Sequence, residues 1–154
     1  MTTATRFLAE MNITAMQHLG EVKATIQLEN YGEAEIARAG LWNPDRVHRA
    51  SVEMVVDTGS TMLVIPESLV RRLGLPTTRQ IVASYSDGRK EIVSVAGVVT
   101  VRWEDRETRV ECVVGSDDIP PLLGQIPLEG LDVLVDCQLQ RLVGRDPSGP
   151  VMRV

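Results

Sequence analysis

The chain has 154 residues, of which 44% are hydrophobic and only 3% aromatic, and it carries a formal net charge of −5. A single domain of this length can bury about two thirds of its unfolded surface, and with so few aromatic residues its core must consist of Val, Leu and Ile, which favours β-sheet. The acidic balance, a pI near 5.1 and the lack of a basic cluster interleaved with aromatic residues argue against nucleic acid as the main partner.

Residues 1 to about 16 are weakly patterned, and residues 1–20 are interpreted as an N-terminal arm. They lack the charged start and following apolar stretch of a secretory signal, and no stretch of the chain approaches the roughly 18 apolar residues of a membrane span. The sequence therefore predicts a cytoplasmic protein with no membrane partner. Because Cys112 and Cys137 are isolated, they are predicted to be thiols that form neither a disulfide nor a zinc site.

The first strands are predicted from alternating apolar and polar residues. This alternation indicates a half-buried strand from Glu21 to Glu29 and, after a turn at residues 30–32, a second strand over residues 33–36. A polar loop over residues 40–49 then leads into the apolar strand Ser51 to Val56.

The most informative segment follows this strand and reads Val56-Asp57-Thr58-Gly59-Ser60-Thr61, a glycine turn between two apolar runs. An aspartate at the mouth of such a turn must face solvent, be paired, or share a proton with another acid. The Thr58 hydroxyl can fix the turn or bridge to a partner, and Gly59 lets backbone N–H groups approach the carboxylate. Asp57 is therefore a candidate catalytic acid. The alternative is a turn aspartate that caps its own backbone.

After this turn the chain is expected to form one short helix and two hairpins. Pro66 to Gly74 has proline near its start, basic residues near its end and a terminal glycine, which predicts the helix. Strands over residues 80–84 and 89–95 flank the turn Tyr85-Ser86-Asp87-Gly88, where Asp-Gly is a strong hairpin signal. Strands over residues 98–103 and 108–114 are predicted to form the second hairpin.

The last elements are again short. An apolar segment ends at Leu122-Leu123-Gly124, a helix is expected over residues 126–131, and residues 133–143 are expected to hold two strands. Many short strands at close spacing predict an all-β fold, either a barrel or a sandwich.

In the order and spacing of these elements the chain resembles the retroviral-type (retropepsin-like), single-lobe aspartic proteases, and looks closest to their small bacterial members. The resemblance covers about residues 21–143 and implies an all-β fold, a closed retropepsin-like β-barrel with one or two short helices, which acts as a homodimer. It assigns residues 21–145 to the protease domain, 1–20 to the arm and 146–154 to a C-terminal tail. The motifs that carry it are Asp57-Thr58-Gly59-Ser60, Leu73-Gly74, Asp87-Gly88 and Leu122-Leu123-Gly124.

The resemblance also implies roles for single residues. Asp57 would be the catalytic acid, Thr58 would reach across the two-fold axis, and Gly59 would leave room for the carboxylate pair, with Ser60 as further support. The remaining implied residues are the flap tip over the substrate, Tyr85, Ser86, Asp87 and Gly88, and the cleft floor beneath the catalytic loop, Leu122, Leu123 and Gly124. No metal and no other cofactor is implied.

Two departures from the viral pattern limit what can be transferred. Gln125 stands where viral enzymes often carry an arginine that helps to lock the dimer, and the flap is not glycine-rich. The choice of substrate therefore does not transfer from the viral enzymes.

The implied chemistry needs two chains. Aspartic proteases activate water between two carboxylates that share one proton, since two like charges about 3 Å apart cannot both ionise. This chain contains a single Asp-Thr-Gly triplet. An aspartic endopeptidase acting on peptides or proteins would therefore be a two-fold homodimer, the commonest kind of oligomer.

Other interpretations remain open at this point. The chain could be a catalytically silent dimeric binding or scaffold module, or a processing factor that cuts only itself or one partner, which the arm of residues 1–20 would suit. Ser60 is not expected to be a nucleophile, because it lacks a Gly-x-Ser-x-Gly elbow and the only histidines are His18 and His48. Two acidic pairs are interpreted as loop-solvating groups rather than metal ligands, and Tyr85 could simply cover the sheet. The pairs are Asp105 with Glu107, and Asp117 with Asp118.

Overall fold

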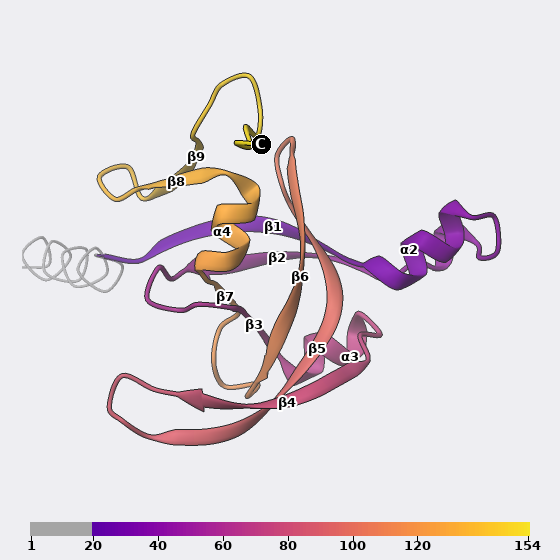
Figure 1. Ribbon diagram of the computed structural model, residues 1–154, viewed down its shortest axis with the longest axis horizontal. Helices are drawn as coiled ribbons and strands as arrows, with labels where there is room; N and C mark the ends of the chain where they lie inside the picture. The colour runs from indigo at the N-terminus through magenta and orange to yellow at the C-terminus, as the bar shows by residue number, and fades with distance from the viewer. Residues whose placement is uncertain (1–19) are drawn as a thin grey trace, which may run out of the picture.

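Short strands dominate the computed structural model, which describes residues 20–154 (Figure 1). The predicted arm, apart from Gly20, lies outside the described residues. In chain order the elements are β1 (Val22–Asn30), α2 (Tyr31–Arg38), the 3-10 helix η1 (Pro44–Arg46), β2 (Arg49–Val56), β3 (Leu63–Pro66), α3 (Glu67–Arg72), β4 (Thr77–Ser84), β5 (Lys90–Trp103), β6 (Arg106–Gly115), β7 (Leu122–Leu123), α4 (Gln125–Leu131), β8 (Val133–Asp136) and β9 (Arg141–Gly144).

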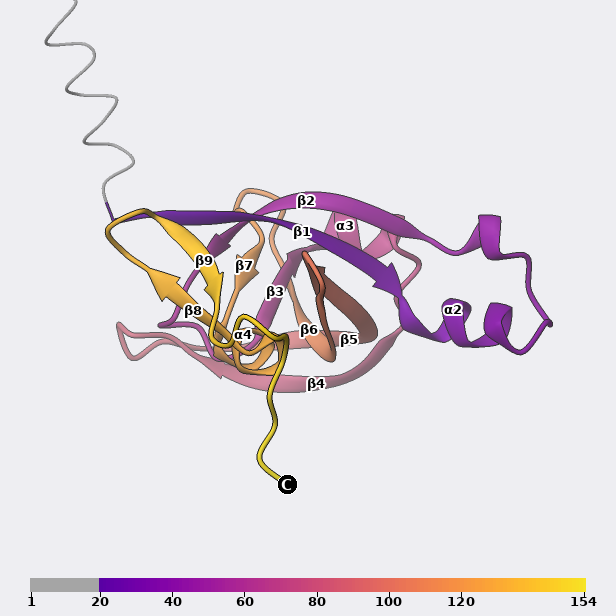
Figure 2. The same ribbon diagram turned by 90° about the horizontal axis from the view of Figure 1, so that it is seen from above.

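The strands form one large sheet and one small one. The seven-stranded sheet has the order β1-β2-β7-β3-β6-β5-β4, and β1 also pairs with β5. Because β1 has partners on both of its edges, the sheet is strongly curled: seen from above, β1 and β2 run along one side and β4 along the other (Figure 2). The hairpin of β8 and β9 forms the two-stranded sheet.

The core lies inside this curl and is aliphatic, as the low aromatic content predicts. Its fully buried side chains come mainly from β1, β2, β3 and β5, and the largest of them include Ile26, Leu28, Met54, Leu63, Ile65, Val99 and Val101. Cys112 is buried beside them, and burial raises the pKa of its thiol to about 12. Both cysteines are free, and Cys137 is exposed. Within residues 20–154 no helix is long and apolar enough to cross a membrane.

The predicted second strand is wrong, because residues 31–38 form helix α2. Asn30 caps this helix, since its side-chain oxygen accepts the N–H of Glu33 at 3.0 Å. Four residues of alternating Glu, Ala and Ile are too few to separate the two periodicities, and Ala and Glu are good helix formers. Helix α2 has no buried residue and projects from one end of the molecule, at the right of Figure 1.

The strands predicted over residues 89–95 and 98–103 are one continuous strand, β5. Its register with β6 shifts between Ala96 and Val99, which marks a β-bulge at Gly97. Gly97, which lies between the two predicted ranges, is therefore the site of a bend within one strand.

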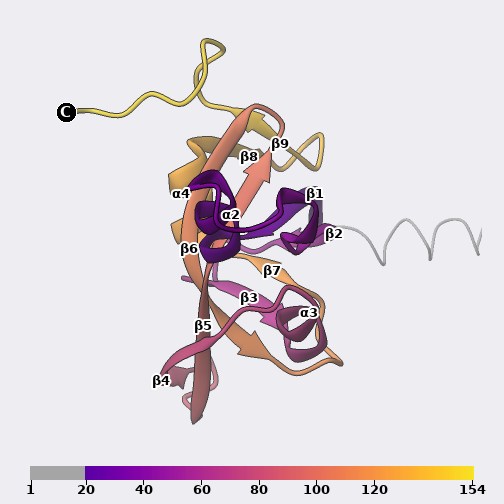
Figure 3. The ribbon, with the colours of Figure 1, turned by 90° about the vertical axis from the view of Figure 1, so that its right-hand side faces the viewer.

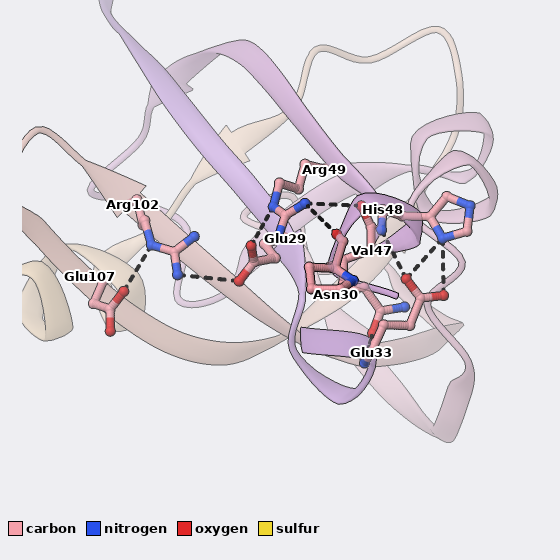
Figure 4. Close-up of polar contacts among 9 residues, drawn as sticks. Glu29, Asn30, Glu33, Val47, His48, Arg49, Arg102 and Glu107 are labelled. Atoms are coloured by element: carbon pink, nitrogen blue, oxygen red, sulfur yellow. Dashed lines mark hydrogen bonds and ion pairs between the residues drawn. The ribbon is translucent and has the colours of Figure 1, made fainter. Parts of the chain in front are cut away.

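A buried carboxylate, Glu29, joins three strands at the end of β1 (Figure 4). Its side chain is 8% exposed and forms ion pairs with Arg49 at 2.6 Å and with Arg102 at 3.2 Å. Arg102 also contacts Glu107 at 2.8 Å. Burial acts to raise the pKa of Glu29, but the hydrogen bonds and charges of Arg102 and Arg49 outweigh it, and the pKa lies below its usual value.

Glu29→Gln is therefore expected to weaken the pH dependence of stability. A carboxyl whose pKa is lowered on folding contributes stability above its unfolded pKa of about 4.3, and this contribution is lost as the pH falls through the folded value. The variant should lose about 2 kcal/mol at pH 7, and less at pH 3. Urea unfolding at both pH values measures this. Glu53→Gln, at a 67% exposed side chain paired with Lys23, is the control and should have little effect at either pH. Equal losses at both pH values for Glu29→Gln would contradict the assignment.

Candidate active site

The Asp57 loop connects β2 to β3 and turns tightly on itself. The Asp57 Oδ1 atom accepts the N–H of Gly59 at 2.9 Å, and the Asp57 carbonyl accepts the N–H of Ser60 at 3.1 Å. A Cβ atom at Gly59 would lie 3.2 Å from Oδ1, so the glycine keeps this approach open. Asp57 is half-buried, while Thr58 and Gly59 are exposed. Asp57 thus caps its own turn, as the alternative interpretation predicts. Only Oδ1 takes part in this hydrogen bond to Gly59, and Oδ2 does not.

Strand β7 lies between the two strands that carry this loop (Figure 1). It pairs parallel to β2, with Leu123 opposite Val56, and antiparallel to β3, with Leu122 opposite Val64. The N–H of Asp57 donates to the carbonyl of Leu123 at 3.0 Å. Residues about 65 positions apart in the sequence therefore hold the aspartate in place by backbone hydrogen bonds.

Gly124 and the start of α4 hold the other side of the loop. The N–H of Gln125 donates to the carbonyl of Ser60 at 2.8 Å, and the N–H of Ile126 donates to the carbonyl of Thr61 at 2.9 Å. A Cβ atom at Gly124 would lie 2.3 Å from the carbonyl oxygen of Met62 and 2.6 Å from that of Ser60. Only glycine therefore fits at position 124, where the chain after β7 passes close to the backbone of residues 60–62. The backbone role of residues 125 and 126 is not predicted from the sequence, in which a glycine at the end of an apolar run is the only signal for it.

The predicted turn at residues 85–88 closes the β4–β5 hairpin. The N–H of Tyr85 donates to the carbonyl of Arg89, and the N–H of Gly88, which has φ +84°, donates to the carbonyl of Tyr85. Asp87 forms an ion pair with Arg89 at 2.6 Å. The Tyr85 hydroxyl donates to Glu91 at 3.1 Å, and this hydrogen bond raises the pKa of the tyrosine. The side chains of Tyr85 and Asp87 are thus paired within the hairpin.

The hairpin tip and the Asp57 loop lie on the same side of the molecule, at the left of Figures 1 and 2, whereas α2 lies at the opposite end (Figure 3 views the molecule from the α2 end). Two surface hollows, of about 410 and 450 Å³, lie elsewhere, by the β5–β6 turn and β9. Trp103 and Gly144 line both, and neither is lined by the Asp57 loop. Neither of these two hollows of the single chain therefore surrounds Asp57.

The other acidic and histidine candidates have structural contacts. Asp117 accepts the backbone N–H of Ser68, Asp118 contacts Ser116, and His48 pairs with Glu33 at 2.9 Å, beside α2 rather than near Ser60. Within residues 20–154 there is no group of three or more side chains of the kinds that hold metal ions. His18 lies outside the described residues.

Comparison with known proteins gives a family and a fold. The family described as Aspartyl protease matches residues 46–126, just over half of the chain. No curated protein sequence matches significantly. Among solved structures, the retroviral protease-like domain of Ddi1 from Leishmania major is 12% identical, with a TM-score of 0.50, over 82% of this chain and 89% of that one.

Two further structures match with lower TM-scores and over a smaller share of this chain. A retropepsin-like aspartic protease from Rickettsia conorii is 21% identical over 56% of this chain and 68% of that one, with a TM-score of 0.41. The EIAV protease in complex with an inhibitor is 20% identical over 51% of this chain and 75% of that one, also with a TM-score of 0.41.

Proposed function

Since this chain belongs to the aspartyl protease family and has a mainly β, retropepsin-like fold, we propose that it is an aspartic endopeptidase active as a symmetric homodimer. The observation that carries the proposal is the presentation of Asp57 on a loop held by β7 and α4, with Oδ1 on the N–H of Gly59. In the dimer, one Asp57 acts as a base toward a water molecule while its protonated mate hydrogen-bonds the substrate carbonyl oxygen. No cofactor is needed for these steps.

The dimer follows from the number of carboxylates. Each chain has one Asp-Thr-Gly triplet, and shared-proton chemistry requires two acids about 3 Å apart. Thr58 and Gly59 are exposed in the single chain. This exposure is expected for residues that would lie beside the two-fold axis of a dimer. We further propose that the pairing of β1 with β5 closes the sheet into a barrel, which gives the loop a rigid support.

The flap and floor complete the proposed site. The turn Tyr85-Ser86-Asp87-Gly88 covers the bound peptide, and Leu122, Leu123 and Gly124 lie beneath it. This arrangement is supported by the position of the hairpin tip and the Asp57 loop, which lie on the same side of the molecule (Figures 1 and 2).

Cleavage of a diverse peptide library, from pH 3 to pH 8, tests the proposal with the wild type and Asp57→Asn. The wild type should show a bell-shaped profile on the acid side of neutrality, because one carboxylate must be ionised and the other protonated. The variant should lose activity by about 10³-fold or more, because an amide can neither accept nor return the proton. Equal cleavage by both proteins would eliminate the catalytic proposal.

A dimeric binding module without turnover is the second candidate. The observation in its favour is the polar flap tip, whose Asp87–Arg89 and Tyr85–Glu91 contacts already satisfy one another. Absence of cleavage by either protein, with peptide binding retained by both, would support this alternative.

A further inference from the structure

The β4–β5 hairpin leaves the large sheet at a defined point. Pairing of β5 with β6 extends only to Val95 opposite Val113, whereas β4 and β5 stay paired as far as Ser84 opposite Lys90. Residues 80–94 therefore form a two-stranded extension of the sheet, here called the hairpin arm, on which Val82 is 63% and Ile92 68% exposed. An isolated two-stranded hairpin is only marginally stable in water, so the position of this arm depends on its base.

Two irregularities in strand pairing lie together at that base. The register between β4 and β5 shifts around Thr78, and the register between β5 and β6 shifts around Gly97. The Thr78 hydroxyl oxygen lies 3.2 Å from the carbonyl oxygen of Val95. Bulges bend strands and increase their twist, so this pair of bulges sets the direction in which the arm departs.

One side chain of β6 reaches across β5 to the base of the arm. Glu111 accepts a hydrogen bond from the Thr78 hydroxyl at 2.8 Å and pairs with Arg79 at 3.4 Å, and both partners are on β4. Gly97 lies beneath this path: a Cβ atom there would be 3.2 Å from Cα and 3.5 Å from Cγ of Glu111. The missing side chain at Gly97 therefore leaves room for the contact between non-adjacent strands.

The charge of Glu111 is maintained by the same partners. Hydrogen bonds from Thr78 and Arg79 hold the pKa of the Glu111 carboxyl below its usual value. On the same strand, Glu107 forms its ion pairs with Arg102 of β5 and Arg109 of β6, and neither partner is on β4. Glu111 is thus the carboxylate of β6 whose partners are on β4, and Glu107 is a natural control.

We propose that Glu111 is a positioning residue that ties Thr78 and Arg79 to β6 and so fixes the angle at which the β4–β5 hairpin leaves the large sheet, on the side of the molecule that carries the Asp57 loop. Its catalytic consequence rests on the proposed function, in which this hairpin is the flap. Glu111 acts through the hairpin and touches neither substrate nor the reacting carboxylates.

Hydrogen–deuterium exchange on the 154-residue Asp57→Asn chain tests the structural part without any need for activity. Adding Glu111→Ala should raise backbone exchange in residues 80–94 about threefold, since a short network of surface contacts is lost. Glu111→Gln should have a smaller effect, because its amide oxygen still accepts from Thr78. Glu107→Ala is the matched control and should leave residues 80–94 unchanged. Unchanged exchange in Glu111→Ala, an equal rise in the control, or a rise that extends through β1 and β2 would each overturn the proposal.

Kinetics on the protein with Asp57 intact tests the catalytic part. If the hairpin positions substrate, Glu111→Ala should raise KM about threefold with little change in kcat, and Glu111→Gln should restore part of the loss. A loss of activity without a change in KM would overturn the link to substrate. Should the protein prove to have no Asp57-dependent cleavage, the exchange result still decides whether Glu111 holds the hairpin.

Discussion

Mixing wild-type chains with Asp57→Asn chains is expected to reduce peptide cleavage as the square of the wild-type fraction. In the proposed dimer each site needs one carboxylate from each chain, so a mixed dimer has an aspartate beside an amide and cannot share a proton. If chains assemble at random, half wild type leaves about one quarter of the sites active, and one tenth wild type leaves about one hundredth. Unfolding the chains together in urea and refolding them as a mixture, at constant total protein, measures this curve.

The shape of the curve separates the possible assemblies. Glu53→Gln chains, altered at an exposed position of β2, are the control, and mixing them with wild type should leave cleavage unchanged. A linear fall with the fraction of Asp57→Asn would mean that each chain works alone, and it would contradict the two-chain site. The quadratic and linear curves differ about tenfold at one tenth wild type, which a cleavage assay resolves.

The parts of the site that were predictable from sequence are the ones with local signals. The Asp57 turn has a glycine and hydroxyl residues between two apolar runs, and the Tyr85–Gly88 turn has Asp-Gly between alternating strands. Both turns occur where predicted, with the expected N–H contacts to Asp57 and across the hairpin. The position of β7 beside the Asp57 loop came from the resemblance to a family, because no local pattern pairs residues so distant in sequence.

The missed features have equally physical reasons. The sequence predicts a strand where helix α2 forms, because a short run of Ala, Ile and Glu fits both periodicities and the deciding contact is the cap by Asn30. The contact of Glu111 with Thr78 spans 33 residues and requires β5 between them, with no side chain at Gly97. Such a contact depends on strand order, which periodicity does not reveal.

Gly124→Ala is expected to lower the free energy of unfolding by about 3 kcal/mol and to abolish most cleavage. The new methyl group would lie 2.3 Å from the carbonyl oxygen of Met62 and 2.6 Å from that of Ser60. Both obstacles are backbone atoms, so the clash cannot be relieved by rotating a side chain, and β7 or the Asp57 loop must shift. A shift of either displaces the hydrogen bond between Asp57 and Leu123.

Gly32→Ala in α2 is the matched control, because its new Cβ would meet only the Asn30 side-chain oxygen, at 3.6 Å. It should be neutral or stabilising by up to about 1 kcal/mol, since alanine is the better helix former. Urea unfolding measures both variants, and cleavage assayed at a temperature where Gly124→Ala stays folded separates a displaced Asp57 from simple loss of protein. Wild-type stability in Gly124→Ala would show that the crossing of β7 and the loop can relax, and the close approach would then not be what holds the aspartate.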